Sequence, residues 1–368
     1  MTIETNPFIN MLIFSFLSIF SSCIGQNTPT GINQNKIVAT GQSVSEMDRK
    51  ITVIFEDSRH NYWFGGGEKG VYKYDGKSMV LFTMKEGLCS PSILGIQEDK
   101  LGNLYFDTTE GICKFDGQQF TTLPVVNASE HDWKLTPDDL WFRMGWDKNG
   151  PYRYDGKNLY HLPFPKNPME GEFYAKYPNA PFEPYGIYSL YTDQQGNIWF
   201  GTSSLGIYRF DGKKVSWMYE QHLTETPEGG AFGIRSIIED RNGNFWFCNT
   251  RYRYEILQDT TKKNGLNLMN YKKARGMADT TDDDAIDFPY FMSIVEDNRS
   301  NLWMATYDDG VWRYDGKQLL HYPINDGETA VLLFSIYKDR QGMLWLGTHN
   351  AGAYQFNGET FEQFSPDL

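Results

Sequence analysis

Short apolar and aromatic runs alternate with polar turn residues along nearly the whole chain, and this pattern recurs as a repeat. The clearest copy spans residues 191–217, with the sequence YTDQQGNIWFGTSSLGIYRFDGKKVSW. The copies, aligned on their central aromatic residue, are centred on Trp63, Tyr105, Trp141, Trp199, Trp246, Trp303 and Trp345. The chain therefore contains seven repeat units.

Each unit contains four short runs of β-branched and aromatic residues, which suit a pleated and buried surface. In the clearest copy the predicted strands lie at 187–191, from Ile198 onward, at 207–210 and at 215–218. A period of roughly 40 to 50 residues with four strands per unit is typical of a β-propeller. We therefore predict an all-β fold, a seven-bladed β-propeller of four-stranded antiparallel blades, over residues 36–368.

The joints between the predicted strands are equally regular. An Asp precedes the second strand of most copies, and its side chain can accept backbone N–H groups of the turn between strands one and two. These residues are Asp57, Asp99, Asp193, Asp240, Asp297 and Asp339. Asp-Gly, a strong hairpin signal, separates strands three and four at residues 75, 116, 155, 211 and 315, and Asn-Gly does so at 357.

Two copies depart from the pattern. The third has the residues Thr136 to Asp139 in place of the Asp turn but keeps its Asp-Gly hairpin, so we expect it to remain a blade. The fifth has a loop near 260–265 in place of that hairpin. The segment 36–40, ahead of the first copy, could pair with the last blade and close the ring, which would remove an exposed strand edge.

The N-terminal segment is predicted to lie outside the fold. Residues 8–20 form a nearly unbroken apolar run, which is too short to span a bilayer comfortably and suits a secretory signal. Cys23 follows small residues, as in a bacterial lipobox, and would be acylated; cleavage before Gln26 by an ordinary signal peptidase is the alternative. We assign residues 1–25 to a lipoprotein-like signal peptide and 26–35 to a flexible tether.

Composition narrows the class of partner. The net charge of -13 argues against nucleic acid and against a generally anionic surface. Three cysteines follow residue 23, an odd number without regular spacing, so we expect no disulfide framework; Cys113 and Cys248 are predicted to be small buried side chains. Any contact with a membrane is expected only through an N-terminal lipid anchor.

The unit SIVEDNRSNLWMATYDDGVWRYDGK, residues 293–317, resembles the two-component regulator propeller repeat. The resemblance extends over residues 50–365. This family builds the extracytoplasmic ligand-sensing parts of hybrid histidine kinases in Gram-negative bacteria, many of which respond to oligosaccharides. Members that signal carry a membrane-spanning helix and a kinase after the propeller. This chain ends soon after its last hairpin, so we expect a stand-alone exported propeller.

The connections of long and irregular length all lie on one face of the predicted propeller. The turns between strands one and two, and between strands three and four, are short and uniform and lie on the same side of a propeller. The long connections at 124–132, 165–185, 221–232 and 272–290 join one blade to the next on the other side. Because loops carry function on a rigid scaffold, this second side is the predicted binding face.

Eight residues on that face are predicted to bind a ligand: Arg143, Trp146, Arg235, Arg251, Tyr252, Tyr307, Asp308 and His349. Arg143 and Asp107 replace a small residue that most other copies have at the equivalent position in the second strand. Either the two charges form a salt bridge between blades, or Arg143 reaches a ligand.

Signals for catalysis are weak. The six His residues show no metal-ligand spacing, and the sequence predicts no cofactor, no metal and no catalytic residue. Seven-bladed lyases of the streptogramin-inactivating kind have similar repeats, and only His349 with Glu68 or Glu110 could form the metal-held cluster that they need. We therefore predict an extracytoplasmic, lipid-anchored sensor in the periplasm or outer membrane that binds a small carbohydrate or a signalling partner protein; a metal-assisted lyase or hydrolase is the alternative.

Overall fold

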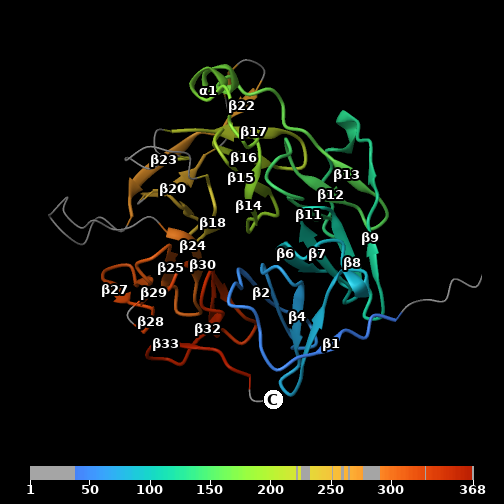
Figure 1. Cartoon of the computed structure of the whole chain (residues 1–368). Coiled ribbons are helices and arrows are strands. Elements are labelled where there is room, and N and C mark those ends of the chain that lie inside the picture. The colour runs from blue at the N-terminus through green and yellow to red at the C-terminus, as the bar shows by residue number, and fades with distance from the viewer. Residues whose placement is uncertain are drawn as a thin grey trace, which may run out of the picture. The chain divides into compact units, whose positions relative to one another are not determined.

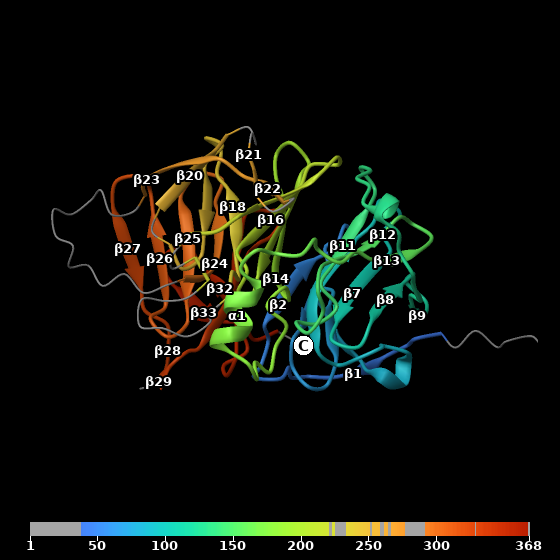
Figure 2. The ribbon, with the colours of Figure 1, turned by 90° about the horizontal axis from the view of Figure 1, so that it is seen from above.

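The computed structural model describes residues 38–220, 223–224, 233–250, 252–257, 261–263, 266–276, 291–327 and 329–366. In this part the chain is nearly all β, and seven sheets of four or more strands stand as blades around a ring, viewed along its axis in Figure 1. Figure 2 shows the same blades from a direction turned by 90°. The predicted all-β seven-bladed propeller is confirmed. The predicted signal peptide and tether, including Cys23, lie outside the described residues.

Four blades follow the antiparallel order of the repeat. Blade one contains β2 (Val53–Glu56), β3 (Tyr62–Gly65), β4 (Val71–Tyr74) and β5 (Met79–Phe82), with β1 (Gln42–Ser43) added beside β5. Blade two contains β6 (Ile93–Glu98), β7 (Leu104–Thr108), β8 (Ile112–Phe115) and β9 (Phe120–Thr122). Blade six contains β24 (Phe291–Glu296), β25 (Leu302–Thr306), β26 (Val311–Tyr314) and β27 (Leu319–Tyr322). Blade seven contains β30 (Leu333–Lys338), β31 (Leu344–Thr348), β32 (Ala353–Phe356) and β33 (Phe361–Gln363), preceded by the hairpin β28 (Asn325–Asp326) and β29 (Thr329–Ala330).

Blade four gains two strands from the stretch of sequence that forms blade five. Blade four contains β14 (Ile187–Thr192), β15 (Ile198–Thr202), β16 (Ile207–Phe210) and β17 (Val215–Met218). Blade five contains β18 (Ile237–Glu239), β19 (Phe245–Phe247), β20 (Tyr252–Ile256) and β23 (Tyr271–Arg275). The loop predicted near 260–265 holds the strands β21 (Thr261–Lys263) and β22 (Leu266–Leu268), and β22 pairs in parallel with β17 of blade four. The connection predicted at 272–290 starts too early, because residues 271–275 are the fourth strand of blade five.

Blade three lacks the strand that would lie nearest the ring axis. Its sheet contains β11 (Leu140–Phe142), β12 (Tyr152–Tyr154) and β13 (Leu159–His161), and β10 (Val125–Val126) pairs in parallel with β13 on the outer side. Residues 127–139, all of them described, contain only the short helix η2 (Glu130–Asp132). The third copy is a blade, as predicted, but it is displaced outward by one strand.

The recurring Asp holds both its turn and the central Trp of its blade. Asp193 accepts the backbone N–H groups of Gln195 and Asn197, at 3.0 and 2.8 Å, and its other oxygen accepts the indole N–H of Trp199 at 2.8 Å. The same indole bond forms in blades one, five, six and seven. The third copy lacks this Asp, and the indole nitrogen of its Trp141 is buried without a hydrogen-bond partner. The predicted role of the Asp is confirmed.

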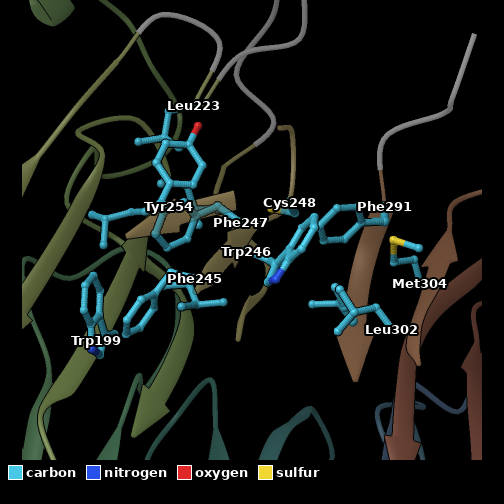
Figure 3. Close-up of a cluster of buried hydrophobic side chains, with 14 of the residues drawn as sticks. Trp199, Leu223, Phe245, Trp246, Phe247, Cys248, Tyr254, Phe291, Leu302 and Met304 are labelled. Carbon is cyan, nitrogen blue, oxygen red and sulfur yellow. The ribbon is translucent and has the colours of Figure 1, made fainter. Parts of the chain in front are cut away.

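Aromatic side chains fill the wedges between the blades. Figure 3 shows one such core, in which Trp199 of blade four lies beside Phe245 of blade five, with ring centroids 4.3 Å apart. Trp246, on the other side of the same sheet, faces Phe291 and Leu302 of blade six. Burying large rings on both faces of each sheet removes apolar surface from water and stabilises the ring.

The ring closes without strand exchange between its ends. Gln42–Ser43 pair with β5 of blade one, and Ala39 donates a backbone hydrogen bond to Gln118 of blade two. The predicted pairing of segment 36–40 with the last blade is therefore wrong for its described residues. Blades seven and one are joined instead by backbone bonds, such as that from the Ile51 N–H to the Thr348 carbonyl at 2.9 Å, and by side-chain bonds, among them the Tyr62 hydroxyl on Asp339 at 2.7 Å. A complete last blade leaves no vacancy for an N-terminal strand.

Two features depart from the sequence expectations. Cys89 and Cys113 form a disulfide bond, although we expected no disulfide framework; they lie at the start of blade two and on β8, which the fold brings together. Cys248 is free and buried, as predicted. The connection 165–185 contains the helix α1 (Glu170–Lys176) at the outer rim of the ring, followed by the buried Tyr185. Among the described residues, no helix is long and apolar enough to cross a membrane.

Candidate functional site

One residue position near the start of the first strand points into a common cavity in six blades. In blades two, four, six and seven a β-bulge skips this residue in the pairing register. A bulge re-aims the side chain of the extra residue away from the regular sheet pattern. The residues at this position are Thr52, Leu94, Tyr188, Arg235, Met292 and Phe334, and all six line a cavity of about 410 Å³.

In blades four and seven the next residue along the strand, a Ser, binds the neighbouring blade. The Ser189 hydroxyl donates to the carbonyl of Ile234 in blade five at 2.7 Å, and the Ser335 hydroxyl donates to the carbonyl of Thr52 in blade one at 2.9 Å. This contact needs the small residue that most copies carry on the second strand. A Cβ on Gly201 would lie 2.3 Å from the Ser189 hydroxyl oxygen and 2.5 Å from the Ile234 carbonyl oxygen.

Blade two carries Asp107 at this position instead of a small residue, because blade three has no first strand to pack against it. Its carboxylate occupies the place of the missing strand and accepts the backbone N–H groups of Arg143 and Met144, both at 2.9 Å. Nε of Arg143 lies 3.7 Å from the carboxylate. The predicted salt bridge between the blades is therefore present.

Arg143 spans the same gap from the other side. Its Nη1 donates to the carbonyl oxygen of Tyr188 in blade four at 2.8 Å, and its Nη2 donates to that of Leu94 in blade two. Both carbonyls belong to bulge residues, so the guanidinium joins the two first strands that flank the gap. Burial lowers the pKa of Arg143 and raises that of Asp107, and in each case the charge of the other residue opposes the shift.

Aromatic rings form much of the cavity wall. Phe334 and Tyr307 flank His349, with ring centroids 5.0 and 5.9 Å away. On the opposite side Trp146 lies 6.5 Å from Tyr188, centroid to centroid. Trp146 and Tyr307 are exposed, so large apolar surfaces flank the entrance to the cavity. Such rings offer flat apolar faces to a ligand.

The charged groups of the wall are cationic. Lys50, Arg143 and Arg235 line the cavity, and the guanidinium of Arg235 lies 4.6 Å from the centroid of the Tyr188 ring. Burial lowers the pKa of His349, and the positive charges of Lys50 and Arg235 lower it further. Among the lining residues in the described part of the chain there is no Asp, Glu, Asn or Gln.

The structure brings five of the eight predicted ligand-binding residues together in this cavity: Arg143, Trp146, Arg235, Tyr307 and His349. Tyr252 and Asp308 are exposed and do not line it; the ammonium of Lys273 lies 4.1 Å from the centroid of the Tyr252 ring. Arg251 lies outside the described residues.

Lys50, and the cavity-lining residues of the first strands other than Arg235, were not predicted from the sequence. An alignment of the first strands contains their signal, because a variable residue stands between an apolar residue and a Ser or Gly in SILGI, GIYSL, GIRSI, YFMSI and LLFSI. A residue that varies between otherwise similar strands gives each blade a different side chain at the same place in the ring.

A second cavity, of about 570 Å³, lies between blades four and five on the face of the short turns. Its carboxylates already serve the fold. Asp193 holds the turn and Trp199, and Asp211 accepts the backbone N–H groups of Lys213 and Lys214 at 2.9 Å each. We therefore place the candidate site in the central cavity.

No group of three His, Cys, Asp or Glu side chains is placed to hold a metal ion in the part of the chain that the structure describes. In the central cavity His349 has the rings of Phe334 and Tyr307 as its neighbours. The arrangement can therefore hold a ligand by stacking and by charge.

Comparison with known families agrees with the repeat pattern. The sequence profile described as two-component regulator propeller matches residues 181–204 and 328–350, which include parts of blades four and seven. Two of the seven repeats, those of blades four and seven, therefore match the two-component regulator propeller repeat. The resemblance predicted from the sequence is thus confirmed. No curated protein matches the sequence of this chain.

Solved structures share its fold at low sequence identity. The extracellular domains of two hybrid two-component systems from B. thetaiotaomicron match with TM-scores of 0.56 each and identities of 20% and 17%, over 85% and 83% of this chain. This chain covers 39% and 40% of those domains, so it spans about two fifths of their length. Virginiamycin B lyase from Staphylococcus aureus matches with a TM-score of 0.59 and 11% identity, over 85% of this chain and 96% of its own.

Proposed function

We propose that this regulator propeller is an extracytoplasmic sensor domain that binds a small ligand in its central cavity. One observation carries the proposal: the same strand position in six blades sends six different side chains into one cavity. A structural role alone would favour the same residue in each repeat, as it does for the turn Asp and the hairpin Gly. Loops and variable positions on a rigid scaffold are where binding specificity resides.

The size and lining of the cavity favour a small molecule over a partner protein. Its volume of about 410 Å³ lies at the lower end of the range for ligand pockets, roughly 300 to 1,000 Å³. Apolar and aromatic walls with a few convergent polar groups are the usual composition of such pockets. The rings of Trp146 and Tyr307 at the entrance suit stacking on the faces of a sugar, so a small carbohydrate is the ligand class that we favour.

Two observations support the extracytoplasmic placement. Residues 8–20 have the apolar length of a secretory signal, and the sensor structures that share the fold are extracellular domains. Lipid anchoring through Cys23 is part of the same proposal. Mass spectrometry of the mature N-terminus tests it, because acylated Cys23 supports the anchor and a free Gln26 contradicts it.

A screen of small carbohydrates by thermal unfolding tests the binding function. A ligand present at a hundredfold excess over its dissociation constant should stabilise the protein by about 2.7 kcal/mol and be recovered unaltered. Met292→Trp fills the cavity and should abolish the effect, while Tyr174→Phe, on the exposed side of α1, should preserve it. If ligands stabilise Met292→Trp as strongly as the native chain, the central cavity is not the site. Turnover of the ligand that a chelator and His349→Ala both abolish would establish the lyase alternative.

A further inference from the structure

The charge of the central cavity is opposite to that of the protein. The chain carries a net charge of -13, yet the charged side chains that line the cavity are Lys50, Arg143 and Arg235. We infer that the cavity binds a sugar that carries a carboxylate, a uronic acid or a short oligomer of one, and that Arg143 receives the carboxylate. This inference rests on the proposed function, since it names the ligand class of the same site.

Arg143 is held ready to bind a carboxylate. A guanidinium has five N–H donors in a rigid plane. One N–H of Nη1 bonds to Tyr188, one of Nη2 bonds to Leu94, and Nε faces Asp107 at 3.7 Å. One N–H therefore remains on each terminal nitrogen. Three anchors fix the plane of the group, so little side-chain freedom is lost when a ligand binds.

Asp107 does not occupy the two remaining N–H groups of Arg143. Its two oxygens face the backbone N–H groups of Arg143 and Met144, and its side chain is buried between blades two and three. It neutralises Arg143 from behind, which makes a buried arginine tolerable in the absence of ligand. Lys50, exposed at the entrance, adds a further positive charge to the wall.

The remaining wall is poor in hydrogen-bond acceptors. The hydroxyl groups of a neutral sugar donate as well as accept, and carboxylate and amide oxygens are the side-chain acceptors that bind such donors most directly. Within the described residues, the lining offers donors from Lys50, Arg143 and Arg235 but no Asp, Glu, Asn or Gln side chain. A carboxylate accepts from cationic donors and donates nothing, so it matches this wall better than a neutral sugar does.

The rings of the wall place the rest of the sugar. Phe334, His349 and Tyr307 form one side of the cavity, and Trp146 and Tyr188 form another. The C–H face of a pyranose ring packs on such surfaces while the acid group points to Arg143. The volume of about 410 Å³ limits the bound part to a few sugar units.

Calorimetry with matched acidic and neutral sugars tests the inference on the whole exported chain. The probes are glucuronate against glucose, galacturonate against galactose, and digalacturonate against galactobiose. We expect at least one acidic member to bind at least tenfold more tightly than its neutral partner, and its affinity to fall with added salt. Arg143→Lys should weaken that binding at least tenfold because lysine cannot present two parallel donors.

Two further variants keep the test decisive if Arg143→Lys unfolds. Lys50→Gln, at an exposed position, should weaken acid binding severalfold without loss of folding, and Arg299→Lys, on an exposed turn of the other face, should change nothing. Neutral sugars that bind as tightly as the acids would overturn the inference and leave the proposed function standing. Absence of binding by every acidic probe, or acid binding that neither Arg143→Lys nor Lys50→Gln weakens, would overturn it as well. If Met292→Trp also leaves acid binding intact, the proposed site itself is wrong.

Discussion

The carboxylate of Asp107 accepts the backbone N–H groups of Arg143 and Met144, both at 2.9 Å, across the boundary between blades two and three. In the other blades a strand of the neighbouring blade occupies this place. Asp107 thus replaces backbone carbonyls with a side chain, and the Arg143 side chain then joins the two strands on either side of the gap. The pair is a structural joint, and its Arg143 also lines the cavity.

Removal of Asp107 should therefore destabilise the fold. In Asp107→Ala the guanidinium of Arg143 loses its counter-charge and two backbone N–H groups lose their acceptor. Breaking a buried ion pair costs about 3 kcal/mol or more. We expect a loss of this size in the free energy of unfolding measured by urea denaturation. Asp308→Ala, at an exposed position, is the control and should stay within about 0.5 kcal/mol. Equal stabilities of the two variants would contradict the structural role of Asp107.

The central tryptophans should differ in their response to the same substitution. Trp199→Phe removes an indole bond to the buried carboxylate of Asp193, whereas Trp141→Phe removes a buried indole N–H that has no partner. A hydrogen bond to a charged group contributes about 1.5 to 3 kcal/mol. Trp199→Phe should therefore cost more stability than Trp141→Phe by about that amount in paired denaturation curves. The opposite order would show that the Asp bond does not stabilise the blade.

Replacing glycine by alanine should lower the stability of the fold at Gly201 and raise it at Gly171. A Cβ on Gly201 would overlap the Ser189 hydroxyl and the Ile234 carbonyl of the next blade, and overpacking of this kind costs about 1 to 3 kcal/mol. Gly171 lies within α1, and a Cβ there would have no heavy atom within 4 Å. Gly171→Ala should stabilise the protein by about 0.5 to 1 kcal/mol, since alanine favours the helix. Thermal unfolding of both variants checks the signs, and stabilisation by Gly201→Ala would mean that the blades are spaced more widely than the structure shows.

Stability should fall as the medium is acidified, in part through His349. Burial first, and then the charges of Lys50 and Arg235, lower the pKa of this imidazole in the folded state. In the unfolded chain the pKa of the His349 imidazole is about 6.5. Between that pH and the lowered pKa, the unfolded chain therefore binds more protons than the folded chain. Stability is therefore full above about pH 6.5 and is lost as the pH falls through the lowered pKa.

His349→Gln should flatten the dependence of melting temperature on pH below about 6.5, compared with the native chain. His131→Gln, at an exposed position, is the matched control and should leave the slope unchanged. His161 is half-buried and its pKa is also lowered, so part of the slope should persist in His349→Gln. A slope identical to that of the native chain would contradict a half-buried His349 whose pKa is lowered by folding.

The sequence by itself determined the local parts of this protein. Four strands per repeat follow from the apolar runs, and the turns follow from Asp193 and its equivalents because a side chain and the backbone N–H groups it accepts lie within six residues. The seven blades follow from counting these local units, and the predicted binding face follows from the lengths of the connections between them. Arg143 could be singled out because it breaks a pattern that most other copies keep.

Only the tertiary structure decided what depends on contacts between distant residues. The missing first strand of blade three explains why Asp107 and Arg143 replace small residues, and no local signal announces that absence. Cys89 and Cys113 pair because the fold brings the start of blade two to β8. Tyr188, Met292 and Phe334 meet in one cavity because the ring brings equivalent positions of separate repeats toward its axis. The local sequence specifies each strand. Ring closure specifies which side chains of different strands share the cavity.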